Sequence, residues 1–582
     1  MTTRDNDLQV RPGRIGNRKI PSTKSFVGQV LRATQKAGGQ GRSGPSRRGQ
    51  SNFGRGRTAF ARNRLFGSHR RVLVKARPVI QRGRGGRSAP LSAHLAYLKR
   101  EGVTRDGTPA RMFGAETDRA DDAAFAERCK DDRHHFRFIV SPEDAAEMTD
   151  LKAFTRDLAA QMEIDLGTKL DWVAVDHWNT DNPHVHLLVR GVAEDGSDLV
   201  IAREYISRNM RSRAEELVAI ELGPKPEHEI RSALQREVGA ERWTRLDAEI
   251  RVEADATGFI DLRAADPNAG DPEIRRLMIG RLQRLEQMGL AAPAGPAQWV
   301  VALDAEQSLR DLGMRGDIVR TMQRAFTEQG RERALGDYVI EGGELSTPIA
   351  GRLIEKGLHN ELTGEAYAVI DGTDGRAHHV RFRGVETFEH SPPIGGIVEV
   401  RRFGGADDPR PTLVLANRSD IDLPAQVTAR GATWLDHRLV ARDSEPLSMG
   451  GFGAETRAAM EARTRHLIGE GLARQHGDRI VFARNLLDTL RRRELDAAGG
   501  RLAAEIGLPH TQAASGEHVA GTYRQRLNLT SGRFAVIDDG LGFSLVPWSP
   551  SLEQHLGRHV AGIARADGGI EWGFGRKRGL EL

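Results

Sequence analysis

The chain has 582 residues, too many for one compact domain, and this length predicts three or four. Charged residues make up 29% and aromatic residues 5%, and we find no apolar run long enough to cross a bilayer and no apolar N-terminal segment typical of a secretory signal. The single cysteine, Cys129, excludes a disulfide framework and a cysteine-rich zinc site, so we expect a cytoplasmic protein without membrane insertion.

The net charge of +6 conceals a strong asymmetry along the chain. Residues 1–90 contain 22 Lys/Arg and two acidic residues, whereas the remainder contains 64 Lys/Arg and 78 Asp/Glu, a net charge of −14. Residues 1–88 are rich in Gly, Arg and Ser and offer little to bury in a core, so we predict a disordered basic arm. Such an arm favours a nucleic acid partner, because cationic side chains release counterions from phosphates. The alternative is a solvated tail that only maintains solubility.

Regular structure is predicted from about Pro90, in a first domain over residues 89–222. Leucines at helical spacing predict a short helix over 91–100, which Gly102 ends. Strands, helices and a tight turn then alternate as in an α+β domain with an antiparallel sheet. The predicted strands are 134–142, 171–178 and 184–191, and the predicted helices are 143–166 and 203–221.

The rest of the chain shows a weak internal duplication. Two helical segments, 274–291 and 460–473, both end in Gly-Leu-Ala and lead into a short strand, as at the end of a winged helix. Each is followed by a segment rich in strand-forming residues, 365–376 and 532–548. We therefore predict winged-helix-like modules that alternate with small β-rich modules. The predicted bounds are 223–330 and 426–500 for the helical modules and 331–425 and 501–582 for the β-rich modules.

Three histidines carry the most chemical information. Alternate side chains of a strand share a face, so His184 and His186 point the same way. If residues 178–183 form a tight turn, His177 lies beside His184 on the neighbouring strand, about 5 Å away. Three converging imidazoles suit a divalent metal and leave positions for a phosphate oxygen. Asp176 and Asp181 are candidates to orient the rings.

The chain has five tyrosines. Tyr97 differs from the others because it lies on a short predicted helix, with His94 one turn earlier and Lys99 and Arg100 beside it. A phenol attacks phosphorus when it loses its proton and the phosphate charge is neutralised. Without the histidine cluster, Tyr97 would be an ordinary residue of an amphipathic helix.

These segments resemble the motifs of a known family. HWNTDNPHVH (177–186) resembles the third motif of the conjugative relaxases, which are HUH endonucleases of plasmid mobilisation. SAHLAYLKREG (92–102) and DRHHFRFIVSPED (132–144) resemble their first and second motifs. The similarity covers about residues 89–222 and is nearest to the mobilisation relaxases related to the nuclease of plant-tumour plasmids. The C-terminal modules are similar to an uncharacterised domain often found behind such relaxases.

The resemblance implies roles for individual residues. Tyr97 would be the nucleophile that forms a 5′-phosphotyrosyl link, and His177, His184 and His186 would bind Mg²⁺ or Mn²⁺. Ser141 would contact DNA, and we expect the arginines Arg100 and Arg137 to do the same. Many family members carry Asp where this chain has Asn179, so a base or supporting role would pass to Asp181 or Asp176.

We therefore expect a bacterial relaxase that nicks DNA at an origin of transfer. Its partners would be single-stranded or locally melted DNA, relaxosome accessory proteins and a type IV secretion coupling protein, with export alongside the transferred strand as an option. A rolling-circle initiator or transposase-type nuclease is the first alternative, with Tyr205 as its nucleophile, although position 209 is Asn where such proteins favour Lys. A non-catalytic DNA-binding regulator is the second.

Overall fold

A computed structural model shows a mixed α+β protein with several sheets. It describes residues 61–80, 91–99, 104–105, 108–178, 182–263, 271–341, 345, 347–403, 412–442, 445–514, 516–565 and 569–573. Strand pairing is antiparallel throughout the named strands except between β8 and β11, which confirms the predicted α+β class with antiparallel sheets. No helix among these residues is long and apolar enough to cross a membrane.

The first domain is built on a four-stranded sheet of order β1-β2-β4-β3. Its strands are β1 (Val72–Ile80), β2 (His134–Pro142), β3 (Trp172–His177) and β4 (His184–Arg190). Its helices are α3 (Leu91–Leu98), α4 (Asp122–Arg128), α5 (Leu151–Leu166) and α6 (Arg211–Leu222). Each of the three predicted strands is present within two residues of its predicted bounds.

The prediction that residues 1–88 are disordered is wrong for the segment that forms β1. Val72 and Val74 alternate with the exposed Leu73 and Lys75 and point into the core, while every residue of β1 pairs with β2. The segments before and after β1 are rich in Arg and Gly, so the composition of residues 1–88 gave no sign of this alternation. Residues 61–66 are helical as well, and Ala61 and Leu65 are buried in the core of the next module. Residues 1–60 lie outside the described part of the chain.

Two helices of this domain differ from their predicted bounds. The helix predicted from residue 143 begins at Leu151, because the Asp150 side chain accepts a hydrogen bond from Lys152 N and so caps the helix there. A short 3₁₀ turn, Ala145–Glu147, occupies part of the interval. The predicted helix over 203–221 opens with a π-helical turn, Tyr205–Met210, and continues as α6.

The two faces of the sheet have different environments. One face carries Phe136, Phe138, Val185 and Leu187 and packs against α5 and α6 in the main core of the domain. On the other face, α3 and α4 cover the β3 side, with Leu95 and Leu98 of α3 against Val173, Val175 and Leu188. The histidines and Arg137 share this second face with Leu188, because alternate residues of a strand point the same way.

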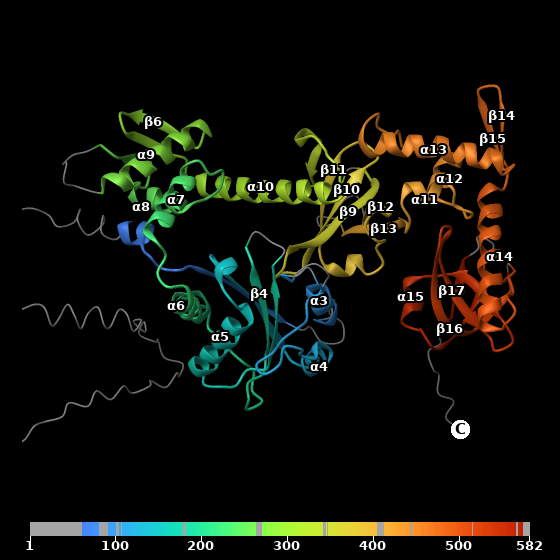
Figure 1. Ribbon diagram of the computed structural model, residues 1–582, viewed down its shortest axis with the longest axis horizontal. Coiled ribbons are helices and arrows are strands. Elements are labelled where there is room, and N and C mark those ends of the chain that lie inside the picture. Colours follow the sequence, from blue (N-terminus) through green and yellow to red (C-terminus); the bar gives the residue numbers. More distant parts are fainter. Residues whose placement is uncertain are drawn as a thin grey trace, which may run out of the picture.

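The first helical module follows the four-stranded sheet of the first domain. It contains the helices α7 (Glu227–Val238), α8 (Arg245–Glu253) and α9 (Pro272–Gln287). Its sheet has the order β5-β7-β6, where β5 is Phe259–Asp261, β6 is Ala291–Gly295 and β7 is Gln298–Val301. The helix α10 (Ala305–Glu328) runs from this module to the first β module (Figure 1). That β module has the strand order β13-β12-β9-β10-β11-β8. Its strands are Tyr338–Ile340, Ile349–Asn360, Glu365–Gly372, Ala377–Phe382, Ile397–Phe403 and Thr412–Ser419, numbered β8 to β13.

The second helical module repeats this plan. Its elements are α11 (Leu423–Val427), α12 (Trp434–Val440), α13 (Gly451–Gly469), the hairpin β14–β15 (Ala473–His476 and Arg479–Phe482) and the long helix α14 (Leu486–Ile506). It extends beyond the predicted 426–500 at both ends. The second β module has the order β18-β17-β16-β19-β20 and the short helix α15 (Pro550–Glu553). Its strands are His518–Leu529, Gly532–Asp538, Phe543–Pro547, His559–Ala564 and Ile570–Trp572, numbered β16 to β20.

The same buried ion-pair network occurs in both helical modules. In the first, the fully buried Arg281 pairs with Asp247 at 2.7 Å, and Asp247 also completes a capping box with Thr244. In the second, Arg463 pairs with Asp436 at 2.9 Å, and Asp436 caps with Thr433. Each arginine also donates to the carbonyls of three residues that precede its capping box. This shared network supports the predicted duplication, whereas the winged-helix assignment stays a prediction.

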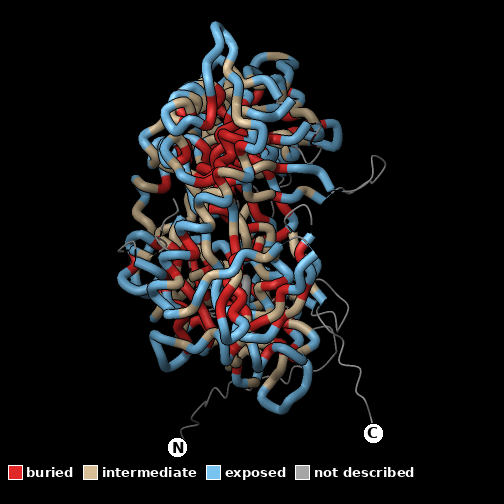
Figure 2. The backbone as a smooth tube through the Cα atoms, turned by 90° about the vertical axis from the view of Figure 1, so that its right-hand side faces the viewer, coloured by how far each residue is buried: buried red, intermediate tan, exposed pale blue. Residues whose placement is uncertain are grey.

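Buried residues form several hydrophobic cores along the molecule, and Figure 2 colours the buried segments red. The first domain, each helical module and each β module has at least one. Leu358 of β9 packs against both the core of the first β module and the core beneath α3. The first domain and the C-terminal half are therefore in direct apolar contact.

The buried networks generate a stability prediction. Asp247→Ala leaves the Arg281 guanidinium buried without its counter-charge, so we expect the free energy of unfolding of that module to fall by about 3–5 kcal/mol. Asp436→Ala should act in the same way on the second module. Chemical denaturation followed by circular dichroism measures the change.

The exposed pair Arg320–Asp317 on α10 provides the control, since both side chains lie mostly in solvent. Asp317→Ala should leave the denaturation midpoint almost unchanged. A similar loss in Asp247→Ala and Asp317→Ala would contradict a special role for the buried networks.

Candidate metal centre and nucleic-acid interface

The three predicted histidines lie together at the ends of β3 and β4. His177 and His184 are directly paired across the two strands, as the tight turn predicts. His186 is paired with Val175, two residues before His177, and so it faces the same side. The ring centroids are 4.5 to 5.5 Å apart, and all three residues are buried.

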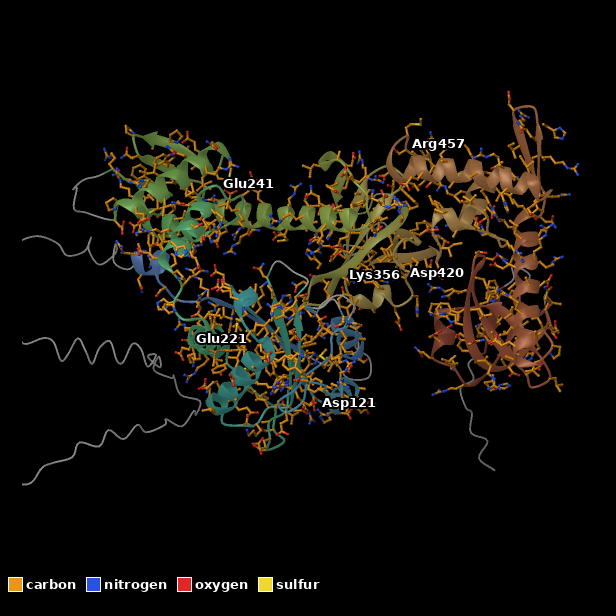
Figure 3. The ribbon with its side chains drawn as sticks, viewed as in Figure 1. Asp121, Glu221, Glu241, Lys356, Asp420 and Arg457 are labelled. Atoms are coloured by element: carbon orange, nitrogen blue, oxygen red, sulfur yellow. The ribbon has the colours of Figure 1, made fainter. Side chains whose placement is uncertain are left out.

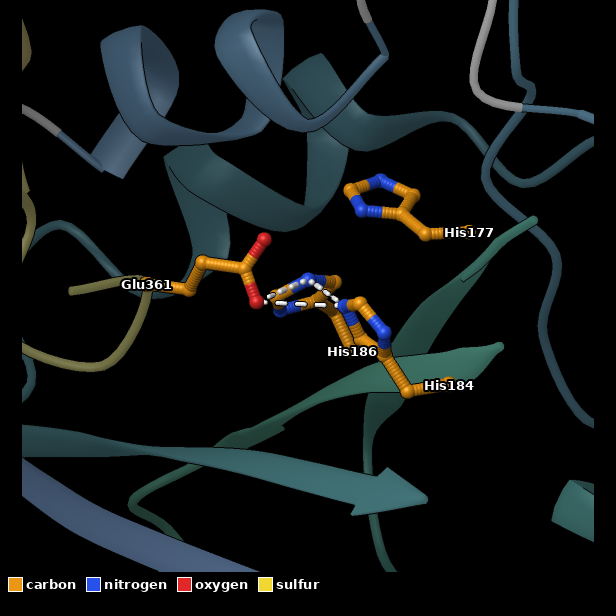
Figure 4. A group of neighbouring side chains, drawn as sticks. All are labelled: His177, His184, His186 and Glu361. Carbon is orange, nitrogen blue, oxygen red and sulfur yellow. Dashed lines mark hydrogen bonds and ion pairs between the residues drawn. The ribbon is translucent and has the colours of Figure 1, made fainter. Parts of the chain in front are cut away.

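Backbone carbonyls, rather than carboxylates, hold two of these rings. His177 Nε2 donates to the Leu98 carbonyl at the end of α3, over 2.8 Å, and His184 Nδ1 lies 2.9 Å from the Asn182 carbonyl. His177 therefore turns Nδ1 toward the cluster, and His184 turns Nε2 toward it (Figure 4). The candidate orienting residue Asp176 is paired with Val185, on the other face, and its carboxylate accepts from Trp178 Nε1 at 2.6 Å.

A fourth side chain, Glu361, completes the cluster. It lies in the turn between β9 and β10 of the first β module, about 175 positions away along the chain. Its Oε2 atom is 3.1 Å from His184 Nε2 and 3.3 Å from His186 Nε2 (Figure 4). Burial alone would raise the pKa of Glu361, but His186 and His184 hold it well below its usual range. Sequence reasoning missed this residue because no local motif marks it.

The donor set fits a divalent cation. One atom from each of the four residues lies within 4.8 Å of the others, and His184 Nε2 is 3.2 Å from His186 Nε2. Two nitrogens bound to one cation at about 2.1 Å are separated by about 3.0–3.4 Å, so this spacing is that of neighbouring ligands. Imidazole nitrogens with one carboxylate are donors that Mn²⁺ and related cations accept.

Tyr97, the predicted nucleophile, lies next to the residue that holds His177. Its side chain packs against the apolar core of the first β module, and its hydroxyl oxygen is buried. Burial, and then the charge of Glu355, raises the pKa of Tyr367 on β10, and the nearby Tyr97 adds a smaller contribution. The structure thus brings the backbone of this tyrosine to the histidines but turns its ring toward the C-terminal half.

The alternative nucleophile Tyr205 lies on the opposite side of the sheet. It belongs to the main core with α5 and α6, and its hydroxyl donates to Asp165 at 3.2 Å. Burial, and then the charge of Asp165, raises its pKa. The sheet itself separates Tyr205 from the histidine cluster.

Arg137 is the best-placed candidate for a DNA phosphate contact. It is buried on the histidine face of β2, directly opposite Arg77 of β1, and its Nε donates to His135. Burial, and then the charge of Arg77, lowers the pKa of Arg137 to about 10. Among the described residues no carboxylate pairs with either arginine. An anion such as a phosphate would neutralise this excess charge.

The other predicted site residues have mixed outcomes. His94 is buried, and burial followed by the charge of Arg137 holds its pKa well below the usual value, so its ring is neutral. Ser141 Oγ donates to the Pro183 carbonyl at 3.3 Å, next to the histidine turn. Arg100, Asn179 and Asp181 lie outside the described residues.

A cavity of about 1320 Å³ adjoins this site and extends between the first domain and the C-terminal modules. Arg77, His94 and Arg137 line it on one side, and the first β module and the second helical and β modules line the other. Its lining includes five arginines and two carboxylates, and one of these, Asp420 (Figure 3), pairs with Arg533 at 2.6 Å. Trp434 and Trp548 add aromatic surfaces. The cavity combines positive charge with the partly exposed aromatic ring of Trp548, a kind of surface on which bases stack in other proteins.

Comparison with known families matches two parts of the chain. The family described as "Protein of unknown function (DUF3363)" matches residues 278–412 and 407–581, together more than half of the sequence. The family described as "Relaxase: MobA/VirD2-like, nuclease domain" matches residues 106–219, which include the three histidines but neither Tyr97 nor Glu361. No curated protein and no solved structure matches the chain.

Metal addition should stabilise the protein through this cluster. A cation that binds only the folded state adds about 2.7 kcal/mol at 100 times its dissociation constant, so we expect Mn²⁺ to raise the melting temperature and a chelator to reverse the rise. His186→Ala should abolish this shift. His476→Ala, at the exposed end of β14, should retain it. An unchanged shift in His186→Ala would place the cation elsewhere.

Proposed function

This chain belongs to the family described as DUF3363 and carries a MobA/VirD2-like relaxase nuclease domain, and from this premise we propose that it is a DNA relaxase for conjugative transfer or mobilisation. It would nick one strand at an origin of transfer and remain attached to the 5′ phosphate through Tyr97. The observation that carries the proposal is the convergence of three imidazoles on one face of the sheet, at the end of the helix that bears this tyrosine.

We assign a separate role in strand cleavage to the histidines, to Tyr97 and to Asp181. A divalent cation held by His177, His184 and His186 would polarise the scissile phosphate. The Tyr97 oxygen would lose its proton and form a bond to phosphorus, while the bond from phosphorus to the 3′ oxygen breaks and that oxygen leaves as a hydroxyl after taking up a proton. We assign the role of proton acceptor to Asp181. The phosphotyrosyl ester conserves the bond energy, so the strand can be rejoined.

The position of Tyr97 adds a condition to this proposal. In the described conformation its ring packs against the first β module and its hydroxyl is buried, so attack requires this contact to open. Entry of DNA between the two halves would provide the opening. A nucleophile that stays buried until DNA binds would also not react with phosphates other than that of the substrate.

We infer that the DNA strand lies along the arginine-lined cavity. Arg137 and Arg77 would neutralise backbone phosphates beside the histidines, and Trp548 would stack with a base farther away. The basic residues 1–60 would add affinity that does not depend on sequence. Relaxosome accessory proteins and a secretion coupling protein are the partners that we propose for conjugative transfer in bacteria.

The nucleophile is identified by trapping the covalent product. Incubation of Tyr97→Phe with an origin oligonucleotide and Mn²⁺ should yield no protein–DNA adduct on a denaturing gel, because phenylalanine has no oxygen to form the ester. Tyr205→Phe should still form the adduct. Loss of the adduct in Tyr205→Phe alone would favour the rolling-circle alternative, and no adduct in the wild type would favour a non-catalytic regulator.

The DNA path is tested by binding measurements. Arg77→Ala and Arg137→Gln should each weaken binding of single-stranded DNA uniformly across sequences and reduce the slope of log affinity against log salt by about one. Arg320→Ala, on an exposed face of α10, is the matched control for loss of one positive charge. Equal weakening in all three variants would indicate a general charge effect rather than this path.

A further inference from the structure

The geometry points to Glu361 as a ligand of the divalent cation, supplied to the nuclease domain by the DUF3363 region. This inference rests on the proposed function, because it assumes that the histidine cluster holds a metal. It assigns a task to the C-terminal half of the chain, which would complete the metal centre rather than act only as an appended domain.

The distances between three of the donor atoms fit a shared cation. His184 Nε2, His186 Nε2 and Glu361 Oε2 form a nearly equilateral triangle with sides of 3.1, 3.2 and 3.3 Å. Three ligands on one face of an octahedral cation, each about 2.1 Å from it, are about 3.0 Å apart. The three atoms therefore have the spacing of ligands that share a cation. The carboxylate oxygen faces both nitrogens at similar distances rather than pairing with one imidazole alone.

Hydrogen bonds within the turn hold the backbone on both sides of Glu361. The Asn360 side chain accepts hydrogen bonds from Leu362 N and Thr363 N, and Gly364 N donates to the Asn360 carbonyl at 2.8 Å. Gly364 has a φ of 78°, a conformation that favours glycine. A Cβ atom placed on Gly364 would lie 3.7 Å from Arg137 Nη1, so the turn sits directly on the nuclease face. The carboxylate is therefore held in position by its own backbone.

The second β module has an apolar residue at the position equivalent to Glu361. Asn360 pairs with Glu365 in the first copy, and Asn528 pairs with Arg533 at the equivalent hairpin of the second copy. The residue that follows the asparagine is Glu361 in the first copy and Leu529 in the second. Leu529 packs against the apolar core around α14, and the backbone of its turn is held by Glu494. The hairpin itself thus needs no acidic residue at this position. The carboxylate is present in the copy that faces the histidines.

The chemistry of the carboxylate suits the expected cation. Imidazole ligands alone favour zinc, copper and related metals, whereas carboxylate oxygens suit Mg²⁺ and Mn²⁺. One carboxylate with three imidazoles leaves two positions of an octahedral cation for a phosphate oxygen and water. Glu361 would therefore shift selectivity toward the harder cations without closing the site to DNA.

The test measures Mn²⁺ binding to the full chain by titration calorimetry in the absence of DNA. Glu361→Gln keeps the shape of the side chain but removes its charge, and we expect Mn²⁺ affinity to fall by about tenfold or more. Relaxation of solvent water by bound Mn²⁺ should also increase in Glu361→Ala, because water replaces the lost ligand. Glu365→Gln, at an exposed position of the same hairpin, should bind as the wild type does.

The outcomes separate this inference from the proposed function. If His186→Ala weakens Mn²⁺ binding and Glu361→Gln does not, Glu361 is not a ligand and the inference fails alone. If Glu361→Gln leaves Mn²⁺ affinity unchanged and binds DNA more tightly, the carboxylate blocks the site, which also overturns the inference. If His186→Ala leaves Mn²⁺ binding unchanged, the metal centre of the proposed function fails with it. Circular dichroism confirms that each variant is folded.

Discussion

The candidate site depends on the register between β3 and β4. Because His177 is paired with His184, and His186 follows two residues later, all three imidazoles emerge on one face of the sheet. A slip of one residue between these strands would turn the histidines of one strand toward α5 and α6, into an apolar core that would not tolerate a charged cation. The pairing of β3 with β4 and the apolar residues that alternate with the histidines therefore determine which face carries the candidate site.

The C-terminal half contacts this site through the β9–β10 hairpin and through apolar packing of Leu358. Leu358 of β9 joins the core under α3 to the core of the first β module, and the turn that follows β9 carries Glu361 to the histidines. The same module covers the ring of Tyr97. The nuclease domain is thus in contact with its neighbour at both the histidine cluster and Tyr97.

Local pattern was sufficient for much of this architecture. Alternation predicted β2, β3 and β4, and the short turn predicted the pairing of His177 with His184, because both signals lie within a few residues of each other. The repeated Gly-Leu-Ala helix ends indicated a duplication, which the equivalent networks of Arg281 and Arg463 support. Glu361 could not be predicted in this way, since its role depends on the packing of two distant segments. Asp176 was misjudged as a ring-orienting residue because the Leu98 and Asn182 carbonyls hold the rings instead.

The strand β1 has a practical consequence for work with fragments of this protein. It covers the outer edge of β2, the strand that carries Arg137 and Ser141. A fragment that begins at residue 89, where regular structure was expected to start, would leave the backbone amides and carbonyls along that edge open to pairing with another molecule. Such a fragment would be prone to self-association, and any loss of DNA binding in it could reflect a damaged sheet rather than a missing basic arm.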